Sequence, residues 1–196
     1  YSPEGWRSGF VKAIKSHVSV PVIAVNTVKH PQFAEQLLQE GVSDFVGMSR
    51  MHIADPYLVQ KAMAGREDLI RKCLGCMNCN KSVVAGRTLH CALNPIAGHE
   101  VTFGDDKLVK NGNGRKVAIV GGGPAGMEAA RVAAERGYAV TLYEKNGLGG
   151  LLDFAEMVKG KHESLGRLRN YLSRMLEVEG VNVVTGQEVD AAFVRE

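Results

Sequence analysis

The sequence predicts an α/β protein whose strands are parallel. Short apolar runs rich in β-branched residues alternate along it with segments of helical periodicity. Proline opens two of these helical segments and glycine closes them. A glycine-rich turn also joins one strand to one helix. The 196 residues, 45% of them hydrophobic, suffice for one large domain or two small ones.

The first 65 residues predict the order α-β-α-β-α. Helix-like spacing of apolar residues covers 4–17, and the run VPVIAV (20–25) predicts a buried strand. A helix is expected over 31–41, a strand over 44–50 and a further helix over 55–65.

Residues 66–113 show little periodicity, and the polar run 110–115 predicts a linker. The alternation then restarts. The expected elements are a strand over 116–120, a helix over 124–136, a strand over 139–144, a helix over 164–180 and a strand over 181–186.

The restart carries the dinucleotide fingerprint G-x-G-x-x-G in its proper place. Gly121, Gly123 and Gly126 follow a predicted strand and open a predicted helix. The first glycine allows a tight turn, the second lets a pyrophosphate approach, and the third lets helix and strand pack closely. The helix N-terminus then offers free N–H groups to the phosphates. A turn of this kind without a ligand is the alternative.

Two features beyond the turn extend this prediction. Glu144 ends the next strand, 23 residues after Gly121, where its carboxylate can accept hydrogen bonds from ribose hydroxyls. An acid there repels a 2′-phosphate, so FAD or NAD is expected rather than NADP. A second glycine cluster, GLGGLL (147–152), either admits more of the same dinucleotide or forms a flexible loop.

All four cysteines lie within 71–91, spaced C-x2-C-x2-C-x11-C at Cys73, Cys76, Cys79 and Cys91. Three close thiolates and a more distant fourth suit the corners of an iron–sulfur cluster. Zinc held by these thiolates, or with His90 or His99 replacing one, is an alternative. Disulfides are the weaker reading, because no export signal marks the N-terminus and disulfides are rare in a reducing cytoplasm.

The net charge and the length of the apolar runs limit the kinds of partner that the sequence indicates. The net charge of +3 is too small to indicate nucleic acid or a membrane surface, and no apolar run is long enough to span a membrane. A cytoplasmic location is expected. The chain starts abruptly and without Met, which suggests a fragment of a longer protein.

Together these motifs resemble, in order and over almost the whole chain, the iron–sulfur flavoenzymes related to 2,4-dienoyl-CoA reductase, enoate reductase and trimethylamine dehydrogenase. The resemblance implies the last strands and helices of an FMN-binding TIM barrel over 1–66. It implies a 4Fe–4S segment and linker over 67–113, and an incomplete Rossmann-like FAD-binding domain over 114–196. The catalytic residues would lie upstream of this chain.

The resemblance also implies site residues. The FMN phosphate would lie on the loops after the last two barrel strands, where this chain has Asn26, Thr27, Ser49 and Arg50. Arg50 can bind a phosphate with two hydrogen bonds. The alternative is that it forms a salt bridge at the surface or at the rim of the barrel. Thr27 is a departure, because relatives commonly carry Arg there; His52 is another, and we expect no chemical role for it. The remaining residues expected to bind cofactor are Gly121, Gly123, Pro124, Ala125, Gly126, Glu144, Lys145, Gly149, Gly150 and Leu151.

The function implied is NAD(P)H-dependent reduction of an activated carbon–carbon double bond in a small enoyl or dienoyl substrate. Electrons would pass from NAD(P)H through FAD, the 4Fe–4S cluster and FMN. One rival is an amine dehydrogenase, which would hold ADP in place of FAD and pass electrons to an external carrier. The other is a non-catalytic electron-transfer fragment or a zinc-stabilised nucleotide-binding fragment. The cysteine spacing resembles both enzyme types in part, and a homo-oligomer is compatible with the sequence.

Overall fold

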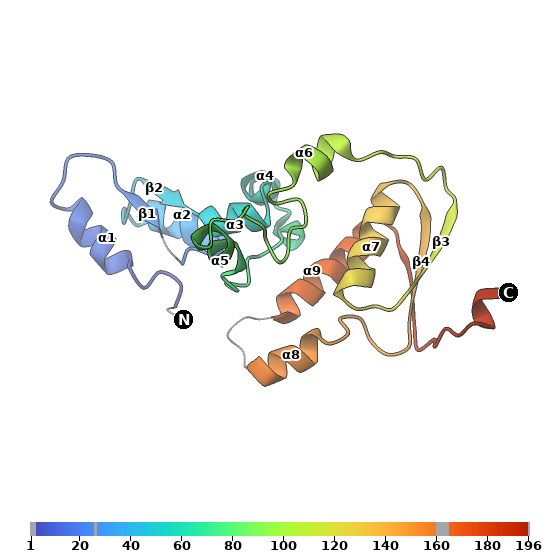
Figure 1. Ribbon diagram of the computed structural model, residues 1–196. Helices are drawn as coiled ribbons and strands as arrows, with labels where there is room; N and C mark the ends of the chain where they lie inside the picture. Colours follow the sequence, from blue (N-terminus) through green and yellow to red (C-terminus); the bar gives the residue numbers. More distant parts are fainter. Residues whose placement is uncertain (1–2, 26, 160–164, 196) are drawn as a thin grey trace. The chain divides into compact units, whose positions relative to one another are not determined.

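The computed structural model describes residues 3–25, 27–159 and 165–195. The chain divides into two compact units, Tyr1–Gly75 and Cys76–Glu196 (Figure 1). Both contain parallel strands, as predicted. Among the described residues, no helix combines the length and the hydropathy that crossing a bilayer requires.

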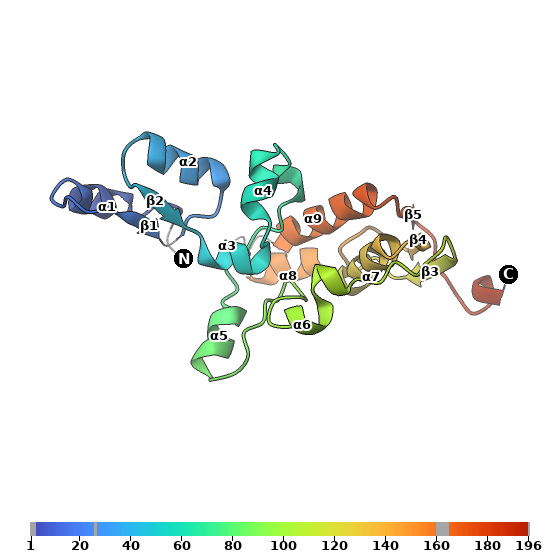
Figure 2. The same cartoon turned by 90° about the horizontal axis from the view of Figure 1, so that it is seen from above.

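The first unit alternates helices and strands in the predicted order. Strands β1 and β2 pair in parallel, with Ala24 opposite Val46 (Figure 2). The elements are α1 (Ser8–Lys15), β1 (Ile23–Val25), α2 (Pro31–Gln39), β2 (Phe45–Gly47), α3 (Ser49–Ala54), α4 (Leu58–Met63) and the 3-10 turn η1 (Glu67–Leu69).

One face of this two-stranded sheet forms a core and the other does not. Ala24 of β1 and Leu37 of α2 are buried together, and Val46 packs against them. On the opposite face Ile23 and Val25 are 57% and 51% exposed. The prediction that 20–25 is a buried strand was therefore wrong for these two side chains. A strand exposes alternate residues to opposite faces, and among the described residues only one face is covered.

The predicted strand 44–50 proved too long. It ends at Gly47, and Ser49 begins α3. Asp55 then holds the turn into α4 from a buried position. Its carboxylate accepts hydrogen bonds from the backbone N–H of Tyr57 (3.1 Å) and Arg71 (2.8 Å) and from Lys61 Nζ (2.6 Å).

The second unit contains a three-stranded parallel sheet of order β3-β4-β5. Strands β3 and β4 have the predicted bounds, whereas α5, α6 and α8 were not predicted. The elements are α5 (Asn78–Val84), α6 (Glu100–Phe103), η2 (Asp105–Lys107), β3 (Lys116–Val120), α7 (Pro124–Glu135), β4 (Ala139–Glu144), α8 (Leu152–Lys159), α9 (Leu165–Val178), β5 (Asn182–Thr185) and η3 (Phe193–Arg195).

Helix α7 packs on this sheet, and α9 packs on α7 (Figure 1). Met127 and Ala130 of α7, Leu142 of β4 and Leu176 of α9 are almost completely buried. The predicted linker 110–115 is a loop that lies alongside the turn between α7 and β4. The N–H groups of Gly112 and Gly114 donate to the carbonyls of Arg136 and Gly137, both at 2.9 Å. The units divide at Gly75, and the three-domain bounds stay a prediction.

Candidate functional site

The glycine turn between β3 and α7 is shaped by contacts within the chain. Gly121 follows β3 with φ +102, a conformation that favours glycine, and its N–H donates to the carbonyl of Tyr143 at 2.8 Å. A Cβ on Gly126 would lie 1.9 Å from the carbonyl oxygen of Gly121, so no larger residue fits without movement. The first and third glycines are thus required by the fold itself.

Gly123 differs from these two glycines. Its φ is −73°, which other residues adopt, and a Cβ placed on it would meet nothing within 4 Å. The side of the turn at Gly123 is therefore open, directly before Pro124 and Ala125 begin α7. A pyrophosphate approaching the start of α7 needs this open backbone, so the turn fits a dinucleotide.

Glu144 lies against this turn. Its Oε1 accepts a hydrogen bond from the N–H of Asn146 at 2.8 Å, and its Oε2 accepts one from Gly122 at 2.6 Å. These two bonds lower the pKa of the Glu144 carboxyl. A carboxylate has about four acceptor positions, so two bonds to the backbone leave capacity for ribose hydroxyls. The neighbouring Lys145 lies 3.8 Å from the carboxylate of Glu188.

The second glycine cluster packs onto the first. The N–H of Gly149 donates to the carbonyl of Gly122 at 2.8 Å. A Cβ on Gly150 would lie 3.0 Å from the Cα of Gly123. Leu151, the next residue, is exposed. The structure thus brings Glu144, Gly149 and Gly150 against the turn 121–126, whereas Lys145 and Leu151 only adjoin these residues in the sequence; the role of all of them in binding stays a prediction.

A cavity of about 350 Å³ lies in the first unit beside the ends of β1 and β2. Thr27, Ser49 and Arg50 line it, as the prediction of a phosphate site requires; Asn26 lies outside the described residues. Thr27 has φ 55, an uncommon conformation for a β-branched residue. Two further cations, Arg7 and Lys29, line the same cavity. An anionic phosphate is the kind of group that this lining fits.

Arg7 and Lys29 were missed by the sequence analysis. Lys29 stands two residues after Thr27, so its charge close to the departure was the available signal; Arg7 offered none. Glu4 fastens this loop by accepting hydrogen bonds from the backbone N–H of Lys29, and from the backbone N–H (3.0 Å) and Nδ1 (2.7 Å) of His30. Burial raises the pKa of Glu4, but the bonds from His30 and Lys29 outweigh it, so the pKa is lowered overall. The ring of His52 donates to the Met48 carbonyl at 3.1 Å.

The four thiols present a different picture. In the part of the chain that the structure describes, none of the four is joined in a disulfide, and Cys76 is exposed. Cys73 lies in the first unit and lines the cavity there, whereas the other three belong to the second unit. The Cys73 and Cys91 sulfurs each accept an N–H hydrogen bond at 3.4 Å, from Gly75 and Leu93.

The donor chemistry suits an iron–sulfur cluster, because thiolates bind such clusters and N–H groups directed at sulfur tune them. Within the described residues, however, no group of three or more His, Cys, Asp or Glu could hold a metal ion. The zinc alternatives His90 and His99 have other neighbours: His90 contacts Ser82 Oγ at 3.2 Å, and His99 packs edge-on against Phe103. The cluster ligands stay a prediction.

Two known protein families match two different parts of the chain. The NADH:flavin oxidoreductase / NADH oxidase family matches residues 2–69, and the pyridine nucleotide-disulphide oxidoreductase family matches residues 104–195. The segment 70–103, with the four cysteines, lies between the two matches.

Individual proteins are similar across both halves. An NADH oxidase from Thermoanaerobacter brockii is 42% identical over 97% of this chain and 29% of its own length. Histamine dehydrogenase from Rhizobium sp. 4-9 is 31% identical with a TM-score of 0.91, covering 99% of this chain and 29% of that one. A 2-naphthoyl-CoA reductase is 30% identical with a TM-score of 0.87, covering 99% and 30%. The chain therefore spans under a third of the length of these relatives.

Proposed function

This chain belongs to the NADH:flavin oxidoreductase / NADH oxidase family, and on that premise we propose that it serves an NAD(P)H-dependent iron–sulfur flavoprotein reductase of activated carbon–carbon double bonds. The observation that carries the proposal is the open glycine turn at Gly123, in the same chain as a cation-lined cavity at the ends of parallel strands. These are the two kinds of phosphate site that a dinucleotide and FMN need. The substrate would be a small enoyl or dienoyl compound.

The chain's own residues would bind and orient the cofactors. Arg50, Ser49 and Thr27 would hold the FMN phosphate, with Asn26 beside them in the sequence. The turn from Gly121 to Gly126 would hold the pyrophosphate of FAD, and Glu144 its ribose. Cys73, Cys76, Cys79 and Cys91 would hold a 4Fe–4S cluster.

When bound, these groups would supply the redox chemistry, by which electrons would pass from NAD(P)H through FAD, cluster and FMN to the substrate. Cysteines that hold a cluster as thiolates would suit a reducing compartment such as the cytoplasm.

An amine dehydrogenase is the second candidate, favoured by the likeness to histamine dehydrogenase. In that case the glycine turn would hold ADP, and electrons would leave the FMN through the cluster to an external carrier. Extraction of the bound nucleotide separates the two candidates. Recovered FAD supports the reductase, and ADP alone supports the dehydrogenase.

The metal is tested on anaerobically purified chain by measuring iron, acid-labile sulfide and zinc. We expect about four iron atoms and about four sulfides per chain. The substitution Cys76→Ser should abolish the visible absorbance of the cluster. Asn80→Ser, at an exposed position of the same segment, should leave it unchanged. Zinc without iron would overturn the cluster and support a zinc-stabilised module instead.

A further inference from the structure

Arg169 contacts both the second glycine cluster and helix α8, which follows that cluster in the chain. It lies on α9, and its side chain packs on Gly149, where an added Cβ would lie 2.8 Å from Arg169 Cδ. Its Nη1 then reaches both carboxylate oxygens of Asp153 at 2.6 Å. Asp153 lies in the first turn of α8, so Arg169 contacts the chain both before and after Gly150.

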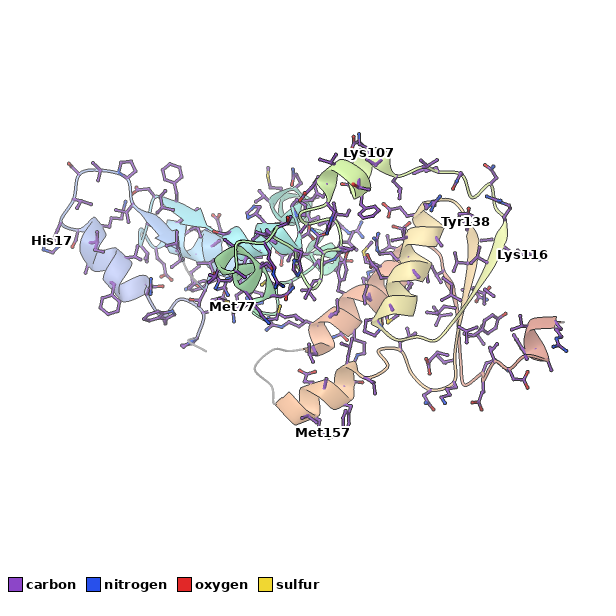
Figure 3. The ribbon with its side chains drawn as sticks, in the orientation of Figure 1. His17, Met77, Lys107, Lys116, Tyr138 and Met157 are labelled. Atoms are coloured by element: carbon purple, nitrogen blue, oxygen red, sulfur yellow. The ribbon has the colours of Figure 1, made fainter. Side chains whose placement is uncertain are left out.

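Helix α8 packs on α9 through partly exposed side chains. None of its described side chains, 152–158, is buried. Phe154, Met157 and Val158 are 59%, 74% and 69% exposed, and Figure 3 shows Met157 on the side of α8 that faces away from α9. Besides the Arg169–Asp153 pair, the described polar contact between α8 and α9 is the bond from the Gly166 N–H to Glu156 Oε2 at 2.9 Å. Within the described residues, polar contacts to α9 therefore hold α8 and the cluster before it, together with the partly buried Leu152 and Ala155.

The position of this cluster matters at the dinucleotide turn. Gly150 lies against Gly123, the glycine whose open side a pyrophosphate would approach, and Gly149 is bonded to Gly122. A small movement of 149–150 would therefore change the space in front of Gly123. If residues 149–150 are already held in the geometry that binding requires, binding costs less conformational entropy, and the affinity for the nucleotide is higher.

We propose that Arg169 is a positioning residue for the dinucleotide site: paired with Asp153, it holds the second glycine cluster against the first and so determines the affinity for the nucleotide. This inference rests on the dinucleotide binding proposed above. It requires no contact between Arg169 and the ligand.

The test compares Arg169→Met, which keeps an unbranched apolar stem, with Asp153→Asn and with the double variant. ADP and FAD are the probes, and isothermal titration calorimetry gives their dissociation constants. Each single variant should weaken binding about tenfold. The double variant should be no weaker than either, because both substitutions break one interaction. Arg169→Lys should recover part of the affinity. The matched control is Arg174→Met on the same helix, where Arg174 pairs with Glu177; it should bind as the wild type does.

Two further readouts separate positioning from a general loss of structure. Amide hydrogen exchange at Gly149, which donates to Gly122, should accelerate in both single variants, while the exchange of β4 amides and the thermal midpoint of unfolding stay close to wild type. These readouts need no ligand.

The outcomes separate the two proposals. If the wild type binds neither probe, the dinucleotide function is overturned, and this inference with it. If the wild type binds but both single variants bind equally well, only the positioning role is overturned. If Arg169→Met weakens binding while Asp153→Asn leaves it unchanged or strengthens it, Arg169 is a direct phosphate ligand, and the positioning role is again wrong.

Discussion

The glycine turn at 121–126 and the cysteine segment at 71–91 are both short sequence motifs. They differ in how far contacts within the chain determine their shape. In the glycine turn, the close approach of Gly126 to Gly121 and the bonds of Glu144 to the backbone produce one defined shape. In the cysteine segment the donors are present, but the described residues contain no group of three or more that could hold a metal ion.

The difference lies in what each motif specifies. A glycine motif acts through sterics, so contacts within the chain are sufficient to form it. A metal-binding motif supplies donor atoms, and the final arrangement of these atoms depends on the metal that they bind. We therefore regard the turn as a site that the chain preorganises, and the thiols as a donor set.

The largest effect in this comparison is expected for Gly126→Ala. The added Cβ would lie 1.9 Å from the Gly121 carbonyl oxygen, which forces helix and strand apart. The free energy of unfolding should fall by about 1–3 kcal/mol, measured by urea denaturation. Gly147→Ala is the control, because a Cβ there meets nothing within 4 Å; it should change stability by less than about 0.5 kcal/mol. Equal stability of the two variants would show that the turn is not sterically determined.

Removal of iron sharpens the other side of the comparison. If the thiols depend on the metal, anaerobic chelation should speed amide exchange across 73–91 by about tenfold or more, because metal binding and local folding are coupled. The β3 and β4 amides should keep their protection, measured by hydrogen exchange with mass spectrometry. Protection across 73–91 that is unchanged by chelation would mean that the chain orders this segment unaided.

The smallest effect is expected for Glu144→Gln, read as a function of pH. Hydrogen bonds from Asn146 and Gly122 lower the folded-state pKa of Glu144 from 4.5. The wild type should therefore have its full advantage in unfolding midpoint above pH 4.5, and lose it as the pH falls through the folded-state pKa. A constant difference between the two proteins across this range would contradict the assignment of these bonds.

Sequence reasoning succeeded where local patterns determine structure. Strands β3 and β4 have the predicted bounds because apolar β-branched runs there end at glycines or at an acid. It missed α8, since the apolar residues of this helix, such as Phe154 and Met157, are exposed and form no core stripe. It also missed Arg7 and Lys29 in the cavity lining, and the fastening of the loop by Glu4. The roles of Arg7 and Glu4 depend on residues far along the chain, such as His30, 26 positions after Glu4, which no local pattern specifies. Lys29 had a local signal, its charge beside Thr27.

The central claim is that the chain preorganises an open dinucleotide turn, and Gly123→Ala tests it most directly. Because Gly123 has an ordinary φ and open space at its Cβ position, we predict an unfolding free energy within about 1 kcal/mol of wild type. The affinity for ADP and FAD, measured by calorimetry, should nevertheless fall about tenfold or more, since the methyl group would stand where the pyrophosphate approaches. Wild-type affinity in this variant would contradict the account.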